Sequence, residues 1–120
     1  MRGYFDHNAT SPLRPEIAAV MAEVMAGEAG NPSSMHSEGR LARSLLDEAR
    51  TQVAALIGSD PGAVLFTSGA TESNNLAIRG AAAANPGLTL VSSAVEHASV
   101  LETVAALAGL GADSVIMDVD

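Results

Sequence analysis

The sequence predicts an α/β fold in which helices cover a mainly parallel sheet. Two observations favour it. Four segments carry apolar residues at helical spacing, and the second half of the chain alternates short apolar runs with helical segments, in the order strand, helix, strand, helix, strand. Strands connected through a helix are typically parallel neighbours. Three strands make a thin sheet, and parallel sheets need cover on both faces, so we expect the front portion of a larger protein.

The first half of the chain, about residues 1–60, is expected to contain an extended start and two helices. Pro15 suits the first turn of the first helix, and Gly27 suits its end. Between them, apolar residues follow the i, i+3, i+4, i+7, i+8 pattern of an amphipathic helix. This stripe consists of Ile17, Val20, Met21, Val24 and Met25.

A polar loop over residues 28–34 separates the first helix from the second, which we expect from about residue 37 to residue 57. Apolar residues recur there every four positions, and Gly58 is the expected terminator. On the solvent-facing side, Arg43 and Asp47 have the i, i+4 spacing of a helical ion pair.

The second half, about residues 61–120, is expected to begin a larger α/β domain. A turn rich in small and polar residues precedes its first strand, and short apolar runs of strand length alternate with helical segments. The predicted elements are a strand over 63–67, a helix from about 71 through 84, a strand over 88–91, a helix over 98–108 and a strand over 114–118.

The composition restricts the classes of function. The formal net charge is −8, with 14 acidic and six basic residues, which argues against a nucleic-acid surface. No apolar run is long enough to span a membrane, and the N-terminus lacks a signal-peptide core, so we expect a cytoplasmic protein. There is no cysteine, and all six basic residues are arginines. The chain therefore offers neither a thiol nucleophile nor an amine that could form an imine with a carbonyl compound.

The segment after the first predicted strand favours an anion site. The first N–H groups of a helix lack internal partners and carry about half a positive charge, and Gly69 and Ala70 let a ligand approach the backbone. The hydroxyls of Ser68 and Thr71 could donate to its oxygens, while Glu72 should face away. Alternatively, Ser68 or Thr71 only caps the helix. Neither G-x-x-x-x-G-K-[ST] nor G-x-G-x-x-G is present, which argues against a nucleotide.

Four segments, in this order, carry a resemblance that covers essentially the whole chain. They are "FDHNATSPLRPEI" (5–17), "GNPSSMHSEGRLAR" (30–43), "VLFTSGATESNNLAIRG" (64–80) and "SSAVEHASVLET" (92–103). The chain resembles the cysteine desulfurases, pyridoxal-phosphate enzymes of the class V aminotransferase group. The resemblance implies the N-terminal part of a fold type I pyridoxal-phosphate-dependent transferase.

The resemblance also implies roles for individual residues. Ala70 and Thr71 would bind the cofactor phosphate, in agreement with the argument from the helix start. His97 would stack on the pyridine ring and transfer protons at the substrate, since imidazole is flat and titrates near neutrality. Without the resemblance, a capping histidine before the next helix is the preferred interpretation of His97. Residues implied to line the substrate pocket are Asn8, Ala9 and Asn31.

The other two histidines, His7 and His36, give little indication of a role in catalysis or metal binding. His7, His36 and His97 include no pair with the spacing of a helical metal site, so we expect no metal. His36 is expected to anchor the loop before the second helix through a hydrogen bond. His7 stands where members of the family commonly have another polar residue, and Ser11 replaces a common threonine.

The implied reaction removes sulfur from L-cysteine and yields L-alanine and an enzyme persulfide. It requires a lysine that holds pyridoxal 5'-phosphate as an imine, an acid at the pyridine nitrogen and a cysteine nucleophile. Lysine and cysteine are absent from the 120 residues, and no acid lies in a motif for the pyridine partner. We therefore expect this chain alone to be inactive. Implied partners are a second copy in a homodimer and a sulfur-acceptor protein, for example in iron–sulfur cluster assembly.

Three alternatives remain at this point. Another class V enzyme, such as a selenocysteine lyase or an aminotransferase, would share these motifs. A non-catalytic truncated paralogue would keep the fold without the chemistry. A phosphate-binding module for another ligand would use only the helix start. The sequence of any longer form, in particular a downstream lysine and a loop bearing a cysteine, separates them.

Overall fold

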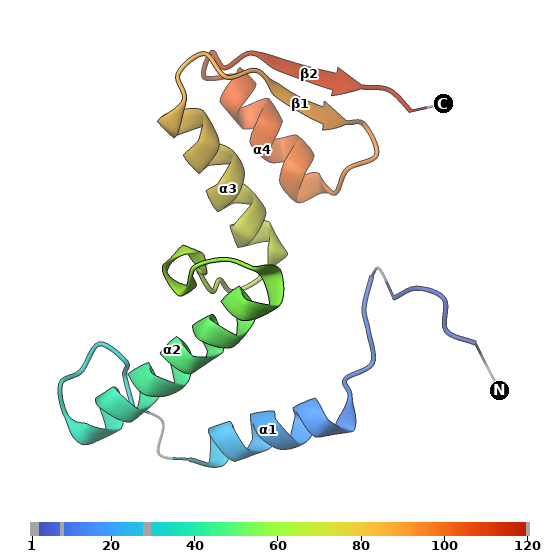
Figure 1. The fold of residues 1–120 in the computed structure, drawn as a ribbon. Helices are drawn as coiled ribbons and strands as arrows, with labels where there is room; N and C mark the ends of the chain where they lie inside the picture. Colours follow the sequence, from blue (N-terminus) through green and yellow to red (C-terminus); the bar gives the residue numbers. More distant parts are fainter. Residues whose placement is uncertain (1–2, 8, 28–29, 120) are drawn as a thin grey trace. The chain divides into compact units, whose positions relative to one another are not determined.

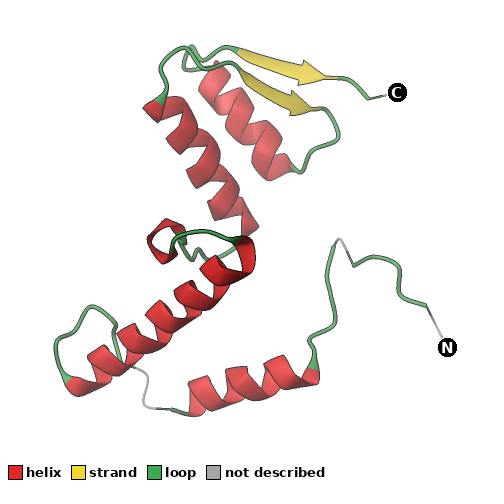
Figure 2. Ribbon diagram, in the orientation of Figure 1, coloured by secondary structure: helices red, strands yellow, loops and turns green. Residues whose placement is uncertain are grey.

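The computed structural model of the chain describes residues 3–7, 9–27 and 30–119 (Figure 1). They form two compact units, which divide between Leu65 and Phe66. Figure 2 shows that the first unit is built from helices and loops, whereas the second contains a pair of strands. None of the described helices combines the length and the apolar character that crossing a membrane requires.

The first unit contains both helices that the sequence predicts. Helix α1 (Pro15–Ala26) has proline at its first position and ends at Gly27, as expected. Helix α2 (Ser37–Ile57) has the predicted bounds and ends at Gly58, whose φ of 67° lies in the left-handed region that favours glycine. The short 3₁₀ helix η1 (Pro61–Ala63) follows, and the Asp60 carboxylate accepts its Gly62 N–H at 2.7 Å.

Helix α1 has the predicted apolar stripe, but none of the residues in this stripe is buried. Ile17, its least exposed member, retains 44% of its accessible surface, and no residue of α1 is buried. Helix α2, in contrast, packs against η1 and buries Ala54 to 1% exposure. The small core of the first unit therefore lies at the C-terminal end of α2.

The predicted Arg43–Asp47 ion pair is wrong. The Arg43 Nε donates to the carbonyl oxygen of Pro32 at 3.0 Å, and Asp47 accepts from Arg50 instead, at 2.7 Å. The loop before α2 returns close to the helix, so its carbonyl groups compete with the carboxylate of Asp47 for the Arg43 guanidinium. Helical spacing alone cannot reveal this competitor.

The loop before α2 lies so close to the helix that Gly39 has no room for a side chain. A Cβ at this buried position would lie 2.7 Å from the Asn31 carbonyl oxygen, and closer still to that of Ser34. We expect Gly39→Ala to cost about 1–3 kcal/mol, because backbone atoms must move. The midpoint of thermal unfolding of the full-length protein should fall by several degrees.

Gly80, inside helix α3, provides the matched control for that substitution. A Cβ there meets no atom within 4 Å, so Gly80→Ala should raise the stability by about 0.5–1 kcal/mol through the better helix propensity of alanine. Equal effects of the two substitutions on the unfolding midpoint would contradict the close packing at Gly39.

The second unit consists of α3 (Ala70–Ala84), β1 (Leu90–Ser93), α4 (Ala98–Ala108) and β2 (Ser114–Met117). The two strands pair in parallel, with Leu90 opposite Ser114 and Ser93 opposite Met117. Helix α4 connects the strands and contacts both of them, and α3 packs along α4 (Figure 1). This arrangement confirms the predicted α/β class with parallel neighbours.

The contact of α4 with its neighbours contains both apolar and polar side chains. Val104 and Leu90 are buried, and the rest of the predicted apolar face of α4 (Val100, Leu101 and Leu107) is half-buried. Ser92, Ser99 and Thr103 are also buried, and the described chain leaves no buried side-chain polar atom without a hydrogen-bond partner. Hydrogen bonds of these polar side chains therefore help to fix the position of α4 against the other elements of the second unit.

Two strand predictions need correction. Residues 63–67 form no strand: Ala63 closes η1, and the residues after it pair with no other described strand. An apolar run becomes a strand only where a neighbouring strand pairs with its N–H and C=O groups, and no described strand pairs with this run. The strand predicted over 88–91 begins two residues later, at Leu90, because Leu88 N–H closes a turn with the Asn85 carbonyl oxygen.

Candidate functional site

The start of α3 offers unpartnered backbone donors. Its N-cap residue, Gly69, makes no side-chain cap, and the first helical hydrogen bond runs from Ser73 N–H to the Gly69 carbonyl oxygen at 3.1 Å. Within the described residues, the N–H groups of Ala70, Thr71 and Glu72 have no acceptor. A Cβ at Gly69 would meet no atom within 4 Å, so the space before the helix is open. Such a helix end fits an anion.

Ser68 and Glu72 hold the turn before this helix. The Glu72 carboxylate turns back and accepts from the Ser68 backbone N–H at 2.8 Å and from the Ser68 hydroxyl at 2.6 Å. The expectation that Glu72 faces away from the helix start is therefore wrong, and the Ser68 hydroxyl is engaged within the chain. The exposed Thr71 is the nearest hydroxyl left for a ligand. Simple capping by Ser68 or Thr71 also fails, since the N-cap is Gly69.

The hydrogen bonds from Ser68 have a consequence in acid. The side-chain bond and then the backbone bond from Ser68 lower the pKa of Glu72 below its usual value of 4.5. Because the folded pKa is depressed, the ionised clamp stabilises the turn fully above pH 4.5 and is lost as the pH falls through the lower folded value. We expect the Glu72 side-chain carboxyl carbon to titrate below pH 4.5 by NMR, together with the Ser68 amide.

Ser68→Ala is the matched variant for this measurement. It removes the hydroxyl but keeps the backbone N–H, so the Glu72 midpoint should move part of the way back towards 4.5. An unperturbed midpoint in the unmodified protein would show that the clamp does not persist in solution.

His97 is the N-cap residue of α4. Its Nδ1 accepts the Ser99 backbone N–H at 3.1 Å and lies 2.9 Å from the Ser99 hydroxyl oxygen, while the residue as a whole is exposed. The predicted capping interpretation of His97 is thus confirmed as a structural role. Capping uses only Nδ1, so it leaves the ring face and Nε2 available for chemistry.

A side-chain bridge connects α3 to the helix that His97 begins. The Asn74 amide nitrogen, one turn into α3, donates to the Ser99 hydroxyl at 2.9 Å. The second unit therefore contains Ala70, Thr71 and His97, and this hydrogen bond joins the second turn of α3 to the first turn of α4. His97 also follows β1 closely, at the carboxyl edge of a parallel pair, where ligands commonly bind in α/β folds.

The residues that the resemblance placed in the substrate pocket belong to the first unit. Ala9 is exposed in a turn that its N–H closes on the Asp6 carbonyl oxygen at 3.2 Å. Asn31 is exposed as well, and its side-chain oxygen accepts the Ser33 N–H at 2.9 Å, which shapes the loop before α2. The prediction for Asn8 lies outside the described residues. Roles for these residues at a substrate stay predictions.

The remaining histidines serve the first unit. His36 is the N-cap of α2, and its Nδ1 lies 3.3 Å from the Gly39 N–H and 2.8 Å from the Glu38 carboxylate. The expected hydrogen bond of His36 is therefore present, but its partners lie in the first turn of α2 and not in the loop that it was expected to anchor. His7 packs edge-on against Tyr4. Nowhere in the described ranges do three histidine or acidic residues come together as ligands for a metal ion.

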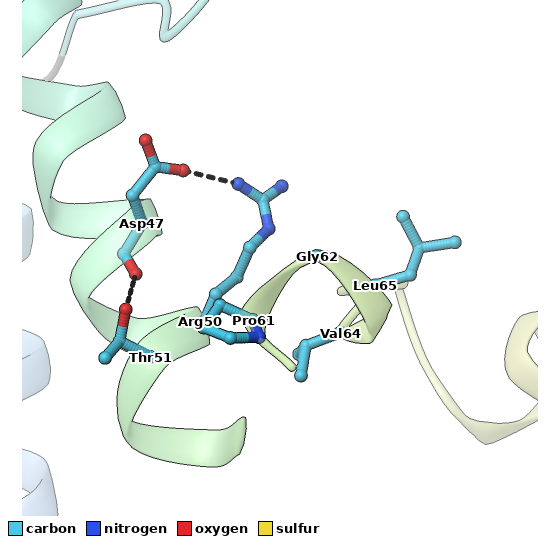
Figure 3. Close-up of a pocket in the computed structure, with 7 residues that line it drawn as sticks. All are labelled: Asp47, Arg50, Thr51, Pro61, Gly62, Val64 and Leu65. Carbon is cyan, nitrogen blue, oxygen red and sulfur yellow. Dashed lines mark hydrogen bonds and ion pairs between the residues drawn. The ribbon is translucent and has the colours of Figure 1, made fainter. Parts of the chain in front are cut away.

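The first unit also contains a hollow of about 390 Å³ between α2 and η1 (Figure 3). Arg50 is the cation on its wall, but its guanidinium is bonded to the Asp47 carboxylate at 2.7 Å, and the Asp47 carbonyl oxygen accepts the Thr51 hydroxyl. Because that positive charge is already paired, the hollow fits an anionic ligand less well than the start of α3.

Sequence reasoning missed Asn74, Ser99 and the inward turn of Glu72. A serine four residues before a glutamate is close to the spacing of a capping box, which could have indicated the clamp. Likewise, the run His97-Ala98-Ser99 ahead of an apolar helix could have been interpreted as a cap with a hydroxyl beside it. No local signal could have paired Asn74 with Ser99, because they are 25 positions apart.

Comparisons with known proteins give a consistent picture. The family model described as aminotransferase class-V matches residues 3–120. The chain is 42% identical, over 97% of its length, to the cysteine desulfurase IscS of Dechloromonas aromatica (strain RCB) and covers 30% of that protein. It is 34% identical to the solved structure of a NifS-like protein, with a TM-score of 0.86, over 97% of this chain and 32% of that one.

A second solved structure, SspA in complex with cysteine, is 34% identical with a TM-score of 0.84; the match covers 95% of this chain and 33% of that one. The chain thus spans about a third of the length of the relatives that it matches.

Proposed function

The chain belongs to the class-V aminotransferase family, and we propose that the full-length protein is a pyridoxal-phosphate-dependent cysteine desulfurase. The fold rests on that membership and on the NifS-like structure, and the full-length enzyme class rests on that membership and on the cysteine desulfurase relative at 42% identity. The observation that carries the proposal for this chain is the unpartnered helix start at Ala70 and Thr71, in one unit with His97.

The start of α3 meets the needs of a cofactor phosphate. Its free N–H groups and open approach suit a dianion. No side chain of the turn over residues 67–72 carries a positive charge, so the backbone supplies the attraction. We assign the N–H groups of Ala70 and Thr71, with the Thr71 hydroxyl, to the phosphate oxygens. Glu72 keeps its carboxylate on Ser68, which draws part of its charge into two hydrogen bonds.

His97 would act at the ring of the cofactor, whereas Ala70 and Thr71 would bind its phosphate. When bound, pyridoxal phosphate supplies a ring that accepts electrons from the substrate. The flat imidazole of His97 would orient that ring by lying against its face, and its Nε2 would hold a proton at the substrate side while Nδ1 stays fixed by the cap. Asn8, Ala9 and Asn31 are proposed to line the pocket for L-cysteine.

The partners follow from the same proposal. We propose a cytoplasmic homodimer that takes sulfur from L-cysteine and passes it to an acceptor protein, as in iron–sulfur cluster assembly. The 120 residues contain no lysine to attach the cofactor and no cysteine to receive the sulfur. We therefore propose that these residues contribute the phosphate site and His97, and that these 120 residues alone turn nothing over.

The test is a product assay. Full-length protein loaded with pyridoxal phosphate should convert L-cysteine to equal amounts of L-alanine and, with a reductant, sulfide, whereas the 120-residue chain under the same conditions should not. Release of selenide from selenocysteine without sulfide from cysteine would favour a selenocysteine lyase. Amino-group transfer without sulfide would favour an aminotransferase and refute the desulfurase proposal.

A further inference from the structure

A continuous line of hydrogen bonds runs from α3 to the ring of His97. The Asn74 side-chain nitrogen donates to the Ser99 hydroxyl oxygen at 2.9 Å, and that oxygen lies 2.9 Å from His97 Nδ1. Ser99 is 7% exposed, and its carbonyl oxygen accepts the hydroxyl of Thr103 at 2.7 Å. Figure 1 shows the two helices side by side, so the line crosses between them.

The direction of each bond follows from which groups can only donate. The Ser99 backbone N–H is 3.1 Å from His97 Nδ1, and because an amide N–H can only donate, this contact favours the tautomer in which Nδ1 presents its lone pair. The neutral ring then carries its proton on Nε2. The Asn74 NH₂ group can likewise only donate, so the Ser99 oxygen accepts from it and keeps its own proton for Nδ1.

We propose that Asn74 and Ser99 are positioning residues that set the orientation and tautomer of His97, with the proton held on Nε2. Two donors on Nδ1 stabilise this tautomer over the one protonated at Nδ1. The inference deepens the proposed function, on which it rests for the role of His97 at the cofactor. The tautomer itself depends only on the hydrogen bonds inside the second unit.

A purely structural role of the hydrogen bond between Asn74 and Ser99 would require less of these two side chains than the positioning role does. To join α3 to α4, Asn74 and Ser99 need only bond to each other, in either direction. To hold the proton on Nε2, the Ser99 hydroxyl must donate to Nδ1, which requires a donor and not an acceptor at residue 74. Reversing the polarity at residue 74 while keeping its size therefore separates the two roles.

The test is the imidazole nitrogen spectrum of His97 in ¹⁵N-labelled full-length holoenzyme, at a pH where the ring is neutral. The unmodified protein should show the tautomer with the proton on Nε2. In Asn74→Asp the carboxylate accepts a hydrogen bond from the Ser99 hydroxyl, so the Ser99 oxygen turns its lone pair to Nδ1. The other tautomer should then gain population, against the Ser99 backbone N–H, which remains and still favours the original one. Ser99→Ala should shift it in the same direction, and Ser99→Thr should restore the original spectrum.

Asn85→Asp is the control, because the Asn85 side chain bonds only to the Ala81 carbonyl oxygen, at the end of its own helix. We expect it to leave the spectrum unchanged. Asn74→Asp should also lower kcat about tenfold with KM within about twofold, a fraction of the 10²–10⁴-fold that a proton-transferring group contributes.

An unchanged tautomer in both Asn74→Asp and Ser99→Ala would overturn the inference even if desulfurase activity is present. A shifted tautomer in a protein without desulfurase activity would refute the proposed function and leave the positioning role standing. Should Ser99→Ala fail to fold, Asn74→Asp still decides, since it retains the size of residue 74.

Discussion

Replacing Ala70 by aspartate is expected to weaken the binding of pyridoxal phosphate by about 100-fold or more. The new carboxylate would stand at the first position of α3, where the proposed phosphate lies against the backbone. Two like charges 4 Å apart repel by on the order of 4 kcal/mol in partly solvated surroundings, and the phosphate carries nearly two charges. Screening at this exposed position reduces the effect, so a 100-fold loss is a moderate expectation.

The same substitution should leave the fold intact. An acidic residue in the first turn of a helix stabilises that helix by about 0.3–1 kcal/mol through the dipole. Loss of the cofactor by Ala70→Asp would therefore not reflect unfolding, and the thermal midpoint of the cofactor-free protein should be equal to or above that of the unmodified protein. Cofactor affinity is measured by absorbance titration of the apoenzyme.

Ala83→Asp is the matched control, since it adds the same charge to an exposed position near the other end of α3. It should bind the cofactor normally and lose a little stability, because a negative charge near a helix C-terminus is unfavourable. If the two variants bound pyridoxal phosphate equally well, the helix start would not be the phosphate site.

Replacing His97 by asparagine is expected to lower kcat by about 10²–10⁴-fold, the usual contribution of a group that transfers protons. Asparagine is among the best N-cap residues, so the variant can still accept the Ser99 N–H and retain the start of α4. The absorbance spectrum of the bound cofactor should change too, because a flat ring no longer covers its face.

His97→Ala completes that comparison. It removes the cap as well as the imidazole and should cost about 0.5–2 kcal/mol of stability beyond the effect of asparagine. The two variants should therefore be equally inactive but unequally stable. Near-normal turnover by His97→Asn would leave His97 with its capping role only.

The helices were predictable because their signals are local. Helix α2 begins and ends at the predicted residues, since His36 and Gly58 mark its ends and apolar residues recur through it. Helix α4 also has its predicted bounds, and α3 begins one residue before the expected position. For α2 and α4, the residues that cap the helix start lie within a few positions of the helix, His36 in one and His97 in the other.

The failures concern interactions between distant segments. Residues 63–67 have the composition of a strand, but pairing depends on a neighbour that the sequence does not specify locally. Arg43 turns to a carbonyl group 11 positions away, and Asn74 bonds a serine in another helix. In the candidate site, the phosphate residues were named from the helix start. The Ser68–Glu72 clamp is the exception among the failures, because it is local and its spacing could have indicated it.

A crystal structure of the full-length protein with pyridoxal phosphate tests the central claim most directly. We predict that phosphate oxygens lie about 2.7–3.2 Å from the backbone nitrogens of Ala70 and Thr71, with the Glu72 carboxylate still bonded to Ser68. A phosphate bound elsewhere, or a protein carboxylate seated on those two N–H groups in its place, would contradict the account.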